Sequence, residues 1–270
     1  CLLGYGANVR EKAGTEEQQS PVSGKENLPQ KKEQSSNIEK ELSQDTGKGW
    51  TSLHYASAEG NADVARALLL KDKEAIEDVD MYGNTAFHLA AKNDRYKVLD
   101  VLKRNDDKIV QKKNNDRQTA LHVAASEGRK KSCTEILKYS PDLHAKDQHG
   151  MTPLHLAARD GRPTVVQLLL DKGAMVVSEE VPKGTDENRM KDKDGRTALH
   201  LAASNGHTNC CTLLLKQCNW TDKKEMTPLH LAAQNGHPDV VQLLLDKGAQ
   251  TLQDGNCLIY FDHAIDNGHT

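Results

Sequence analysis

The sequence predicts an all-α solenoid of stacked helix-turn-helix units with short β-hairpin fingers. A 23-residue segment at 152–174 returns almost unchanged at 227–249, with four positions different and 19 identical. A Thr-x-Leu-His tetrad, once with Phe in place of Leu, recurs in steps of 34, 34, 33, 45 and 30 residues, beginning at Thr51, Thr85, Thr119, Thr152, Thr197 and Thr227. Self-similarity at such a period is the signature of a repeat architecture.

Each copy of the 23-residue segment contains two helical patterns separated by a glycine. In the first, Thr152 is a candidate N-cap and Pro153 takes the first helical position, where its missing N–H costs nothing. The second, at 165–170, is apolar over most of its surface and ends at Lys172-Gly173, a cation followed by a residue that readily adopts a left-handed conformation. Two such short helices cannot enclose a core. Their apolar surfaces must therefore be buried between neighbouring units.

These motifs resemble ankyrin repeats. The resemblance is carried by the Thr-Pro-Leu-His-x-Ala run, the Gly-His turn and the Leu-Leu-Leu-x-x-Gly-Ala end, each of which occurs in two of the units. It implies a stack whose hairpin tips and first helices form one continuous concave binding surface.

The chain divides into four parts. We interpret residues 1–10 as the tail of a truncated repeat, 11–49 as a disordered insertion, 50–254 as six repeats and 255–270 as a degenerate truncated repeat. Because both ends fall within a repeat, we interpret the chain as an internal fragment of a longer protein. The repeats are expected at 50–82, 83–116, 117–149, 150–194, 195–224 and 225–254, the fourth enlarged within Met175–Lys193 and the fifth shortened at Gln217–Asp222.

The segment 11–49 differs in composition from the rest. It has no Phe, Trp or Tyr and is rich in Glu, Lys, Gln and Ser. It cannot bury enough apolar surface to offset the entropy of ordering, which predicts disorder. A loop insertion between repeats is the simplest interpretation, and a regulatory segment phosphorylated at Ser20 is the alternative.

Turn signals between the units predict the finger tips. Those at 115–118 and 223–226 lack a glycine, so they need Asn or Asp at positive φ or another turn type. The tip residues best placed to contact a partner are Tyr82, Arg117, His149, Arg196 and Lys224. For any one of them, an ordinary solvated turn residue is the simpler interpretation.

Charge and composition exclude several classes of function. The formal net charge is −3, from 36 basic and 39 acidic residues, with no basic face interleaved with aromatics, so nucleic-acid binding is not predicted. No apolar run approaches the roughly 20 residues of a membrane helix. Direct membrane insertion by this segment is therefore not expected.

The six cysteines form no CxxC pair, and so indicate neither a zinc site nor a redox motif. Aligning the repeats places Cys133, Cys210 and Cys211 at core positions. Cys218 falls at a helix end and should be the most exposed thiol of the regular repeats. Reduced thiols fit a cytosolic compartment.

Histidine is the residue most suggestive of catalysis or metal binding. Six of the twelve histidines occupy the fourth position of the tetrad, at His54, His88, His122, His155, His200 and His230. A ring that recurs once per unit is most simply a structural element that links the Thr to the backbone of the neighbouring finger. No HExxH, GxxxxGK[ST], GxSxG or kinase motif is present. We predict no catalytic residues, no cofactor and no metal site, and no enzyme activity for this segment.

A closer resemblance rests on the runs 124–129, 149–158 and 165–174 and on the ending 257–269. Together they are similar to the cytoplasmic ankyrin region of ankyrin-type transient receptor potential (TRPA) cation channels. The insertion at 11–49 and the enlarged fourth repeat depart from that pattern. The resemblance implies the N-terminal cytosolic arm of a tetrameric, nonselective, calcium-permeable channel of the plasma membrane that responds to irritants or temperature.

The arm's role would be coupling, with other subunits of a homotetramer or cytosolic proteins as its partners. The pore would lie downstream of Thr270, so no functional residue is carried over. A soluble ankyrin adaptor or scaffold is the alternative, and an ankyrin-bearing enzyme is a third class.

Overall fold

The computed structural model describes residues 49–174, 190–215 and 220–249. Within these ranges the helices come in pairs, each with an inner helix that follows a tetrad Thr and an outer helix after the turn. The inner helices are α2 (Ser52–Glu59), α4 (Ala86–Lys92), α6 (Ala120–Ser126), α8 (Pro153–Arg159), α10 (Ala198–Ser204) and α12 (Pro228–Gln234). The outer helices are α3 (Ala62–Lys71), α5 (Tyr96–Asn105), α7 (Lys130–Leu137), α9 (Pro163–Asp171), α11 (Thr208–Leu214) and α13 (Pro238–Asp246). Two 3₁₀ segments, η2 (Glu74–Glu77) and η3 (Asp107–Gln111), follow α3 and α5.

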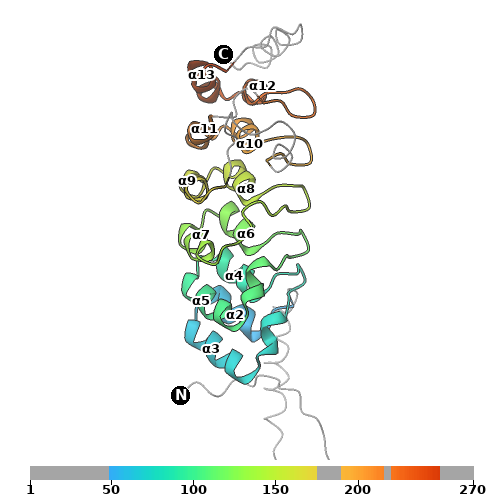
Figure 1. The fold of residues 1–270 in the computed structure, drawn as a ribbon, viewed down its shortest axis with the longest axis vertical. Helices are drawn as coiled ribbons and strands as arrows, with labels where there is room; N and C mark the ends of the chain where they lie inside the picture. Colours follow the sequence, from blue (N-terminus) through green and yellow to red (C-terminus); the bar gives the residue numbers. More distant parts are fainter. Residues whose placement is uncertain (1–48, 175–189, 216–219, 250–270) are drawn as a thin grey trace, which may run out of the picture.

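The pairs stack in single file along the long axis (Figure 1). Inner helices pack against inner helices and outer against outer, from α2 on α4 through α10 on α12 and from α3 on α5 through α11 on α13. The fingers project from the inner column, on the side away from the outer helices (Figure 1). The predicted all-α solenoid is confirmed. The expected insertion 11–49 and the degenerate repeat 255–270 lie almost wholly outside the described residues.

The core is continuous through the stack because each unit covers its neighbour. Leu154 and Leu229, the corresponding leucines of the two most similar units, are both buried. Ala157 and Ala158 of α8 are fully buried, as are the alanines at the same positions in α4, α6 and α10. A methyl side chain lets the next inner helix approach closely, which a larger residue would prevent.

The fingers differ in one respect from the prediction, because they are turns rather than β-hairpins. In the part of the chain that is described, the only β-type pairing is an isolated bridge between Val79 and Thr85. A polar side chain takes the place of a longer ladder. In one finger, Asp147 Oδ1 accepts hydrogen bonds from the backbone N–H groups of His149 at 2.8 Å and Met151 at 2.9 Å. Asp80, Asn114, Asp192 and Asp222 bind the backbone of their own fingers in the same way.

The two fingers that lack a glycine keep the same turn, but the strained residue is not the expected Asn or Asp. Positive φ falls on Arg117 (60°) and Glu225 (62°), at the position that Gly83, Gly150 and Gly195 hold in the other fingers. The Asx side chain two residues before the tip fixes the turn geometry, so the left-handed position cannot move onto Asn115 or Asp116.

Arg117→Gly and Glu225→Gly are each expected to stabilise the stack, by about 1 kcal/mol, because a left-handed backbone costs an L-residue that much and glycine almost nothing. The midpoint of urea unfolding, followed by circular dichroism, should rise for both variants. Lys193→Gly serves as the control, because Lys193 is also exposed in a finger but has no positive φ. It should not raise the midpoint. A fall with Arg117→Gly would show that the turn strain has been misjudged.

Candidate functional site

The most prominent surface feature is the groove between the fingers and the inner helices, which we call the concave groove. Its walls are the successive fingers, and its floor is formed by the inner helices. It is built by three sets of hydrogen bonds that repeat from unit to unit.

The first set joins each inner helix to the next finger through the tetrad histidine. In the third unit, His122 Nδ1 accepts from the Thr119 N–H at 3.2 Å, and Nε2 lies 3.2 Å from the carbonyl oxygen of Met151. Because a backbone N–H only donates and a carbonyl only accepts, the ring must be the neutral tautomer with its proton on Nε2. His54, His88, His155 and His200 make the same pair of bonds. The predicted structural role of these histidines is confirmed.

Burial controls the protonation of these rings. Removal from water lowers the pKa of His88, His122, His155 and His200 from 6.5 to about 4, against the opposing effect of their backbone hydrogen bonds and nearby carboxylates. Burial also lowers the pKa of His54 and His230. A second proton would have to sit on Nδ1, which already faces the N–H of the Thr.

The second set joins neighbouring fingers through their backbones. Lys193 N–H donates to the His149 carbonyl at 3.0 Å, and Lys223 N–H donates to the Asp194 carbonyl at 3.0 Å. The same contact links the Asn115 N–H to Tyr82 and the Gln148 N–H to Asp116. The fingers therefore form one connected wall rather than independent projections.

The third set lies on the opposite edge of the groove floor, at the turn between inner and outer helix. A side chain of each unit reaches back to a carbonyl at the end of the preceding inner helix. Arg162 Nε donates to Ser126 O at 2.9 Å, and His207 Nε2 lies 2.9 Å from Arg159 O. Arg95, Arg129 and His237 make the equivalent bonds. The glycine of the preceding turn leaves room for this side chain, because a Cβ on Gly161 would lie 2.7 Å from the His207 ring.

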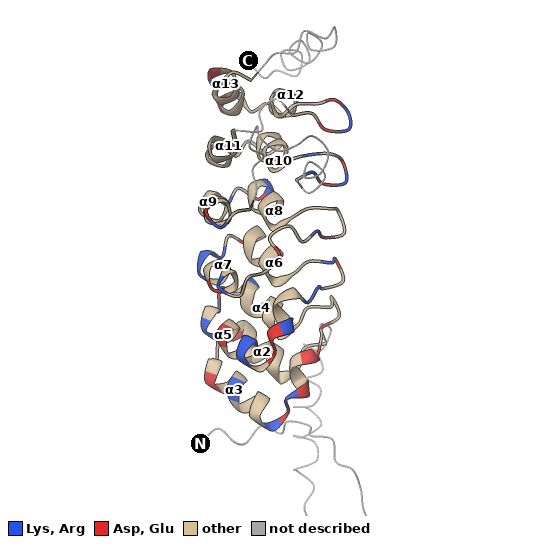
Figure 2. Ribbon diagram, in the orientation of Figure 1, with Lys and Arg blue, Asp and Glu red and all other residues tan. Residues whose placement is uncertain are grey.

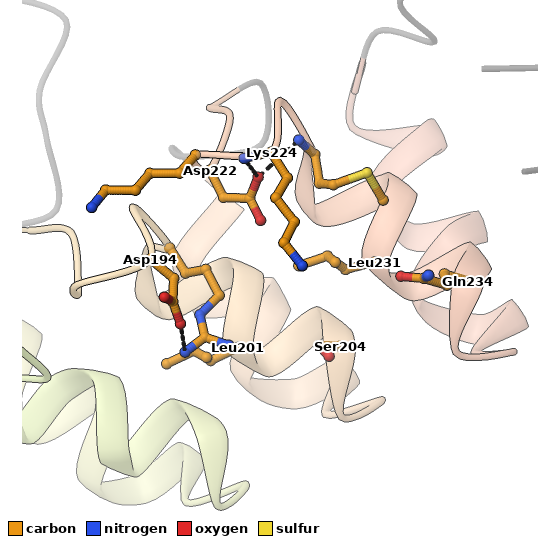
Figure 3. A pocket seen from close by; sticks show the side chains of 10 residues that line it. Asp194, Leu201, Ser204, Asp222, Lys224, Leu231 and Gln234 are labelled. Carbon is orange, nitrogen blue, oxygen red and sulfur yellow. Dashed lines mark hydrogen bonds and ion pairs between the residues drawn. The ribbon is translucent and has the colours of Figure 1, made fainter. Parts of the chain in front are cut away.

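At the C-terminal end, the groove contains an open pocket of about 430 Å³. Leu201 of α10 and Leu231 of α12 lie on its helical side, and Asp194, Asp222 and Lys224 border it from the fingers (Figure 3). The pocket thus combines an apolar floor with a charged rim, which is the usual composition of a site for a polypeptide segment.

A second pocket of about 540 Å³ lies at the N-terminal end of the groove, where Trp50 and Tyr82 face Leu89 and Val123. Helix α8 lies between the inner helices that line these two pockets. Arg159 binds both carboxylate oxygens of Asp160 at 2.8 and 2.9 Å.

This ion pair is itself anchored on both sides. Asp160 also accepts from Ser126 Oγ at 2.5 Å, and Arg159 Nη1 lies 3.9 Å from Met151 Sδ. Leu156, at the position of Leu89 and Leu201, is fully buried. Arg159 is therefore held in a side-chain network on α8, between the helices that line the two pockets.

Charges of both signs line the finger wall (Figure 2). In a third depression, of about 580 Å³, Lys146, Lys191, Lys193 and Lys223 lie among the fingers with Arg117. Several of the carboxylates there are already engaged. Asp192 pairs with Arg196 at 2.9 Å, and its other oxygen accepts from the finger backbone.

The five residues proposed to contact a partner fall in two groups. Tyr82, Arg117, His149 and Lys224 are exposed at the finger tips. Arg196 lies just past its tip and is half-buried, because its guanidinium pairs with Asp192 and Asp194. Tyr82 lines the N-terminal pocket, Lys224 and Arg196 line the C-terminal pocket, and Arg117 lines the third depression. Their role in binding stays a prediction.

The cysteine assignments are confirmed where the structure describes them. Cys133, Cys210 and Cys211 are fully buried, and burial raises the pKa of their thiols to about 12, 11 and 12. They act as small core residues at this depth. Cys218, the predicted exposed thiol, lies outside the described residues.

Sequence reasoning missed the Asx residues of the fingers and the side chains that span the third set of bonds. Both had a signal in the repeats. Asp or Asn stands five residues before the tetrad Thr in five of the six units, and Arg or His follows the turn glycine in four units.

Among the described residues, no group of three or more His, Cys, Asp or Glu could hold a metal ion. No helix in the described ranges combines the length and the apolarity needed to span a lipid bilayer.

Comparison with known proteins places this architecture in context. A family model described as "Ankyrin repeats (3 copies)" matches residues 30–113, 104–180 and 176–254. The chain is 52% identical over 58 residues to transient receptor potential cation channel subfamily A member 1 of Homo sapiens, a match that covers 20% of this chain and 5% of the channel. It is 25% identical over 138 residues to target of rapamycin complex 2 subunit AVO2 of Saccharomyces cerevisiae, covering 51% of this chain and 32% of that subunit.

A third relative is protein phosphatase 1 regulatory subunit 27 of Homo sapiens, 44% identical over 43 residues, with 16% of this chain and 28% of that protein covered. The matches thus span a third or less of each of these relatives.

Proposed function

Because the chain belongs to the ankyrin-repeat family, we propose that its concave groove binds protein and that the chain is the cytosolic arm of a TRPA-like, nonselective, calcium-permeable cation channel. In this proposal the pore lies elsewhere in the polypeptide, and the full-length protein is in the plasma membrane. The arm contacts other subunits of a homotetramer or cytosolic proteins, and it performs no catalysis.

The groove supports the first part of the proposal. Two pockets with apolar floors, about 430 and 540 Å³ in volume, lie in line along one face. Exposed tip residues border both, and the backbone-linked finger wall holds them in fixed positions. A preformed surface of this kind lowers the entropy cost of binding.

The match to the channel supports the second part, because it has 52% identity over 58 residues. A stack whose units contact only their neighbours also suits a coupling role. A displacement at one end is passed through the histidine bonds and the outer helices to the other.

A soluble ankyrin adaptor is the second candidate. It is favoured by the matches to subunits named for the target of rapamycin complex 2 and for protein phosphatase 1, the first of which covers 51% of this chain.

Reading the native transcript past the codon for Thr270 separates the two candidates. The channel assignment requires a run of apolar segments of about 20 residues each, enough to form a pore. A stop codon, or a further soluble domain without such segments, would contradict the channel and favour the adaptor.

A photo-crosslinking amino acid placed at position 224, and separately at 82, tests the groove itself. We expect crosslinks to protein from the native cytosol at both sites, because each borders a pocket. Position 172 is the control, since Lys172 is exposed at the end of an outer helix. Equal yields at 172 and 224 would argue against the groove as the binding face.

A further inference from the structure

One position on the outer helices breaks the repeat pattern of burial. Counting thirteen residues from each tetrad Thr gives Val64, Val98, Ser132, Val165, Cys210 and Val240. The last five are at most 1% exposed, whereas Val64 of α3 is 51% exposed.

The cause is the absence of a described neighbour. In the stack, each outer helix from α5 onward packs against the outer helix before it. Within the described residues no outer helix precedes α3, which is the first of the outer column (Figure 1). Val64 therefore lacks the preceding outer helix that its counterparts have. Leu68, which is half-buried, shares this face, and the equivalent Leu102, Ile136 and Leu169 are fully buried.

The most exposed apolar residue of α3 does not belong to this face. Leu70 is 83% exposed, but its equivalents are charged and exposed, at Arg104, Lys138, Asp171 and Asp246. Its exposure is therefore ordinary for its place in the repeat. The contrast between Val64 and Leu70 distinguishes a face that the fold normally covers from one that it leaves in water.

The chain itself contains a segment of matching chemistry. Leu2-Leu3-x-x-Gly6-Ala7 repeats the spacing of Leu169-Leu170-x-x-Gly173-Ala174, the end of outer helix α9 and its cap. In that unit Leu169 and Ala174 are buried. An outer-helix end preceding α3 would stand where α9 stands relative to α11.

We propose that residues 2–7 pack as the end of an outer helix against the exposed face of α3 formed by Val64 and Leu68. Extra chain length between neighbouring units is compatible with this packing, because the tetrad spacing grows to 45 residues in the fourth unit while α8 still packs on α10. Covering Val64 gives the first described unit the neighbour that all the others have.

Hydrogen exchange of the α3 amides in the whole 270-residue chain tests this docking. Val64→Asp and Leu2→Asp, at the counterpart of buried Leu169, should each speed exchange about tenfold, the size expected for a lost buried contact. Because both remove the same contact, the double variant should exchange no faster than either single one. Asp in the first turn of α3 favours the helix dipole, so local helix effects cannot produce the loss at Val64.

Leu70→Lys is the matched control and should leave exchange in α3 unchanged. The proposal is overturned if Val64→Asp, like Leu70→Lys, leaves the exchange rate of the α3 amides unchanged, because the face is then open to water. It is also overturned if Val64→Asp acts while Leu2→Asp does not, since something other than residues 2–7 covers the face. An effect seen only at protein concentrations where sedimentation shows a dimer would assign the face to a second copy of the chain. That result would also overturn the proposal.

Discussion

Lowering the pH from 7 to 5 is expected to remove several kcal/mol from the free energy of unfolding, well before the carboxylates titrate. Four tetrad histidines have a folded pKa of about 4 against an ordinary value of 6.5. Between these values the unfolded chain binds protons that the folded chain cannot, so stability is complete above about pH 6.5 and falls as the pH drops toward 4. At pH 5 the loss is roughly 2 kcal/mol per histidine, at 1.36 kcal/mol per pKa unit.

Urea unfolding at a series of pH values between 5 and 7 measures this dependence. His122→Gln should reduce the slope of the free energy of unfolding against pH by the equivalent of about one bound proton. The amide can still donate to the Met151 carbonyl, but it does not titrate. His149→Gln, at an exposed finger tip, is the control and should leave the slope as it is. If His122→Gln and His149→Gln have the same slope, the buried rings are not the source.

Gly161→Ala is expected to destabilise the stack by roughly 2–3 kcal/mol, the sum of left-handed strain and a disrupted hydrogen bond. Gly161 has a φ of 65°, and an added Cβ would lie 2.7 Å from two atoms of the His207 ring. The ring cannot move away without lengthening its 2.9 Å contact with the Arg159 carbonyl. The contact between the α10–α11 unit and the preceding α8–α9 unit would then be weakened.

Gly173→Ala separates the two contributions. Gly173 also has a positive φ, 87°, but an added Cβ meets nothing within 4 Å. It should therefore cost only the strain, about 1 kcal/mol. Denaturation midpoints of the two variants, compared with the unmodified chain, give the difference directly. Equal losses would mean that the side chain of His207 adapts freely and that the third set of bonds contributes little.

The period of the tetrads was sufficient to predict the stack, the helix pairing and the buried leucines. The bonding role of His122 could also be predicted, because a residue repeated in every unit has to serve the unit rather than one site. The positive φ of Arg117 and Glu225 could not be predicted, since sequence preference favours Asn or Asp in that conformation. In the folded stack, Arg117 and Glu225 have positive φ instead, because the Asx hydrogen bonds fix which residue of the finger takes this conformation.

The side-chain network around Arg159 was also beyond the sequence. The position is Ala58, Lys92, Ser126, Ser204 or Gln234 in the other units, and nothing in the repeat marks Arg as the centre of such a network. Its effect depends on Asp160, Ser126 and Met151, which come from three elements. Helix caps can be predicted because their residues are close in the sequence. The contacts of Arg159 form only after the units have stacked.

The enlarged fourth unit has a practical consequence. His155 still contacts the Arg196 carbonyl at 3.2 Å, and Ala174 and Met190 are both buried, on either side of the extra residues. The described residues on both sides of 175–189 are therefore held by the contacts of the stack itself. A fluorescent reporter or an affinity epitope inserted between Ala174 and Met190 is therefore expected to leave the stacking of the helices unchanged. Such an insertion would label the intact protein in cells.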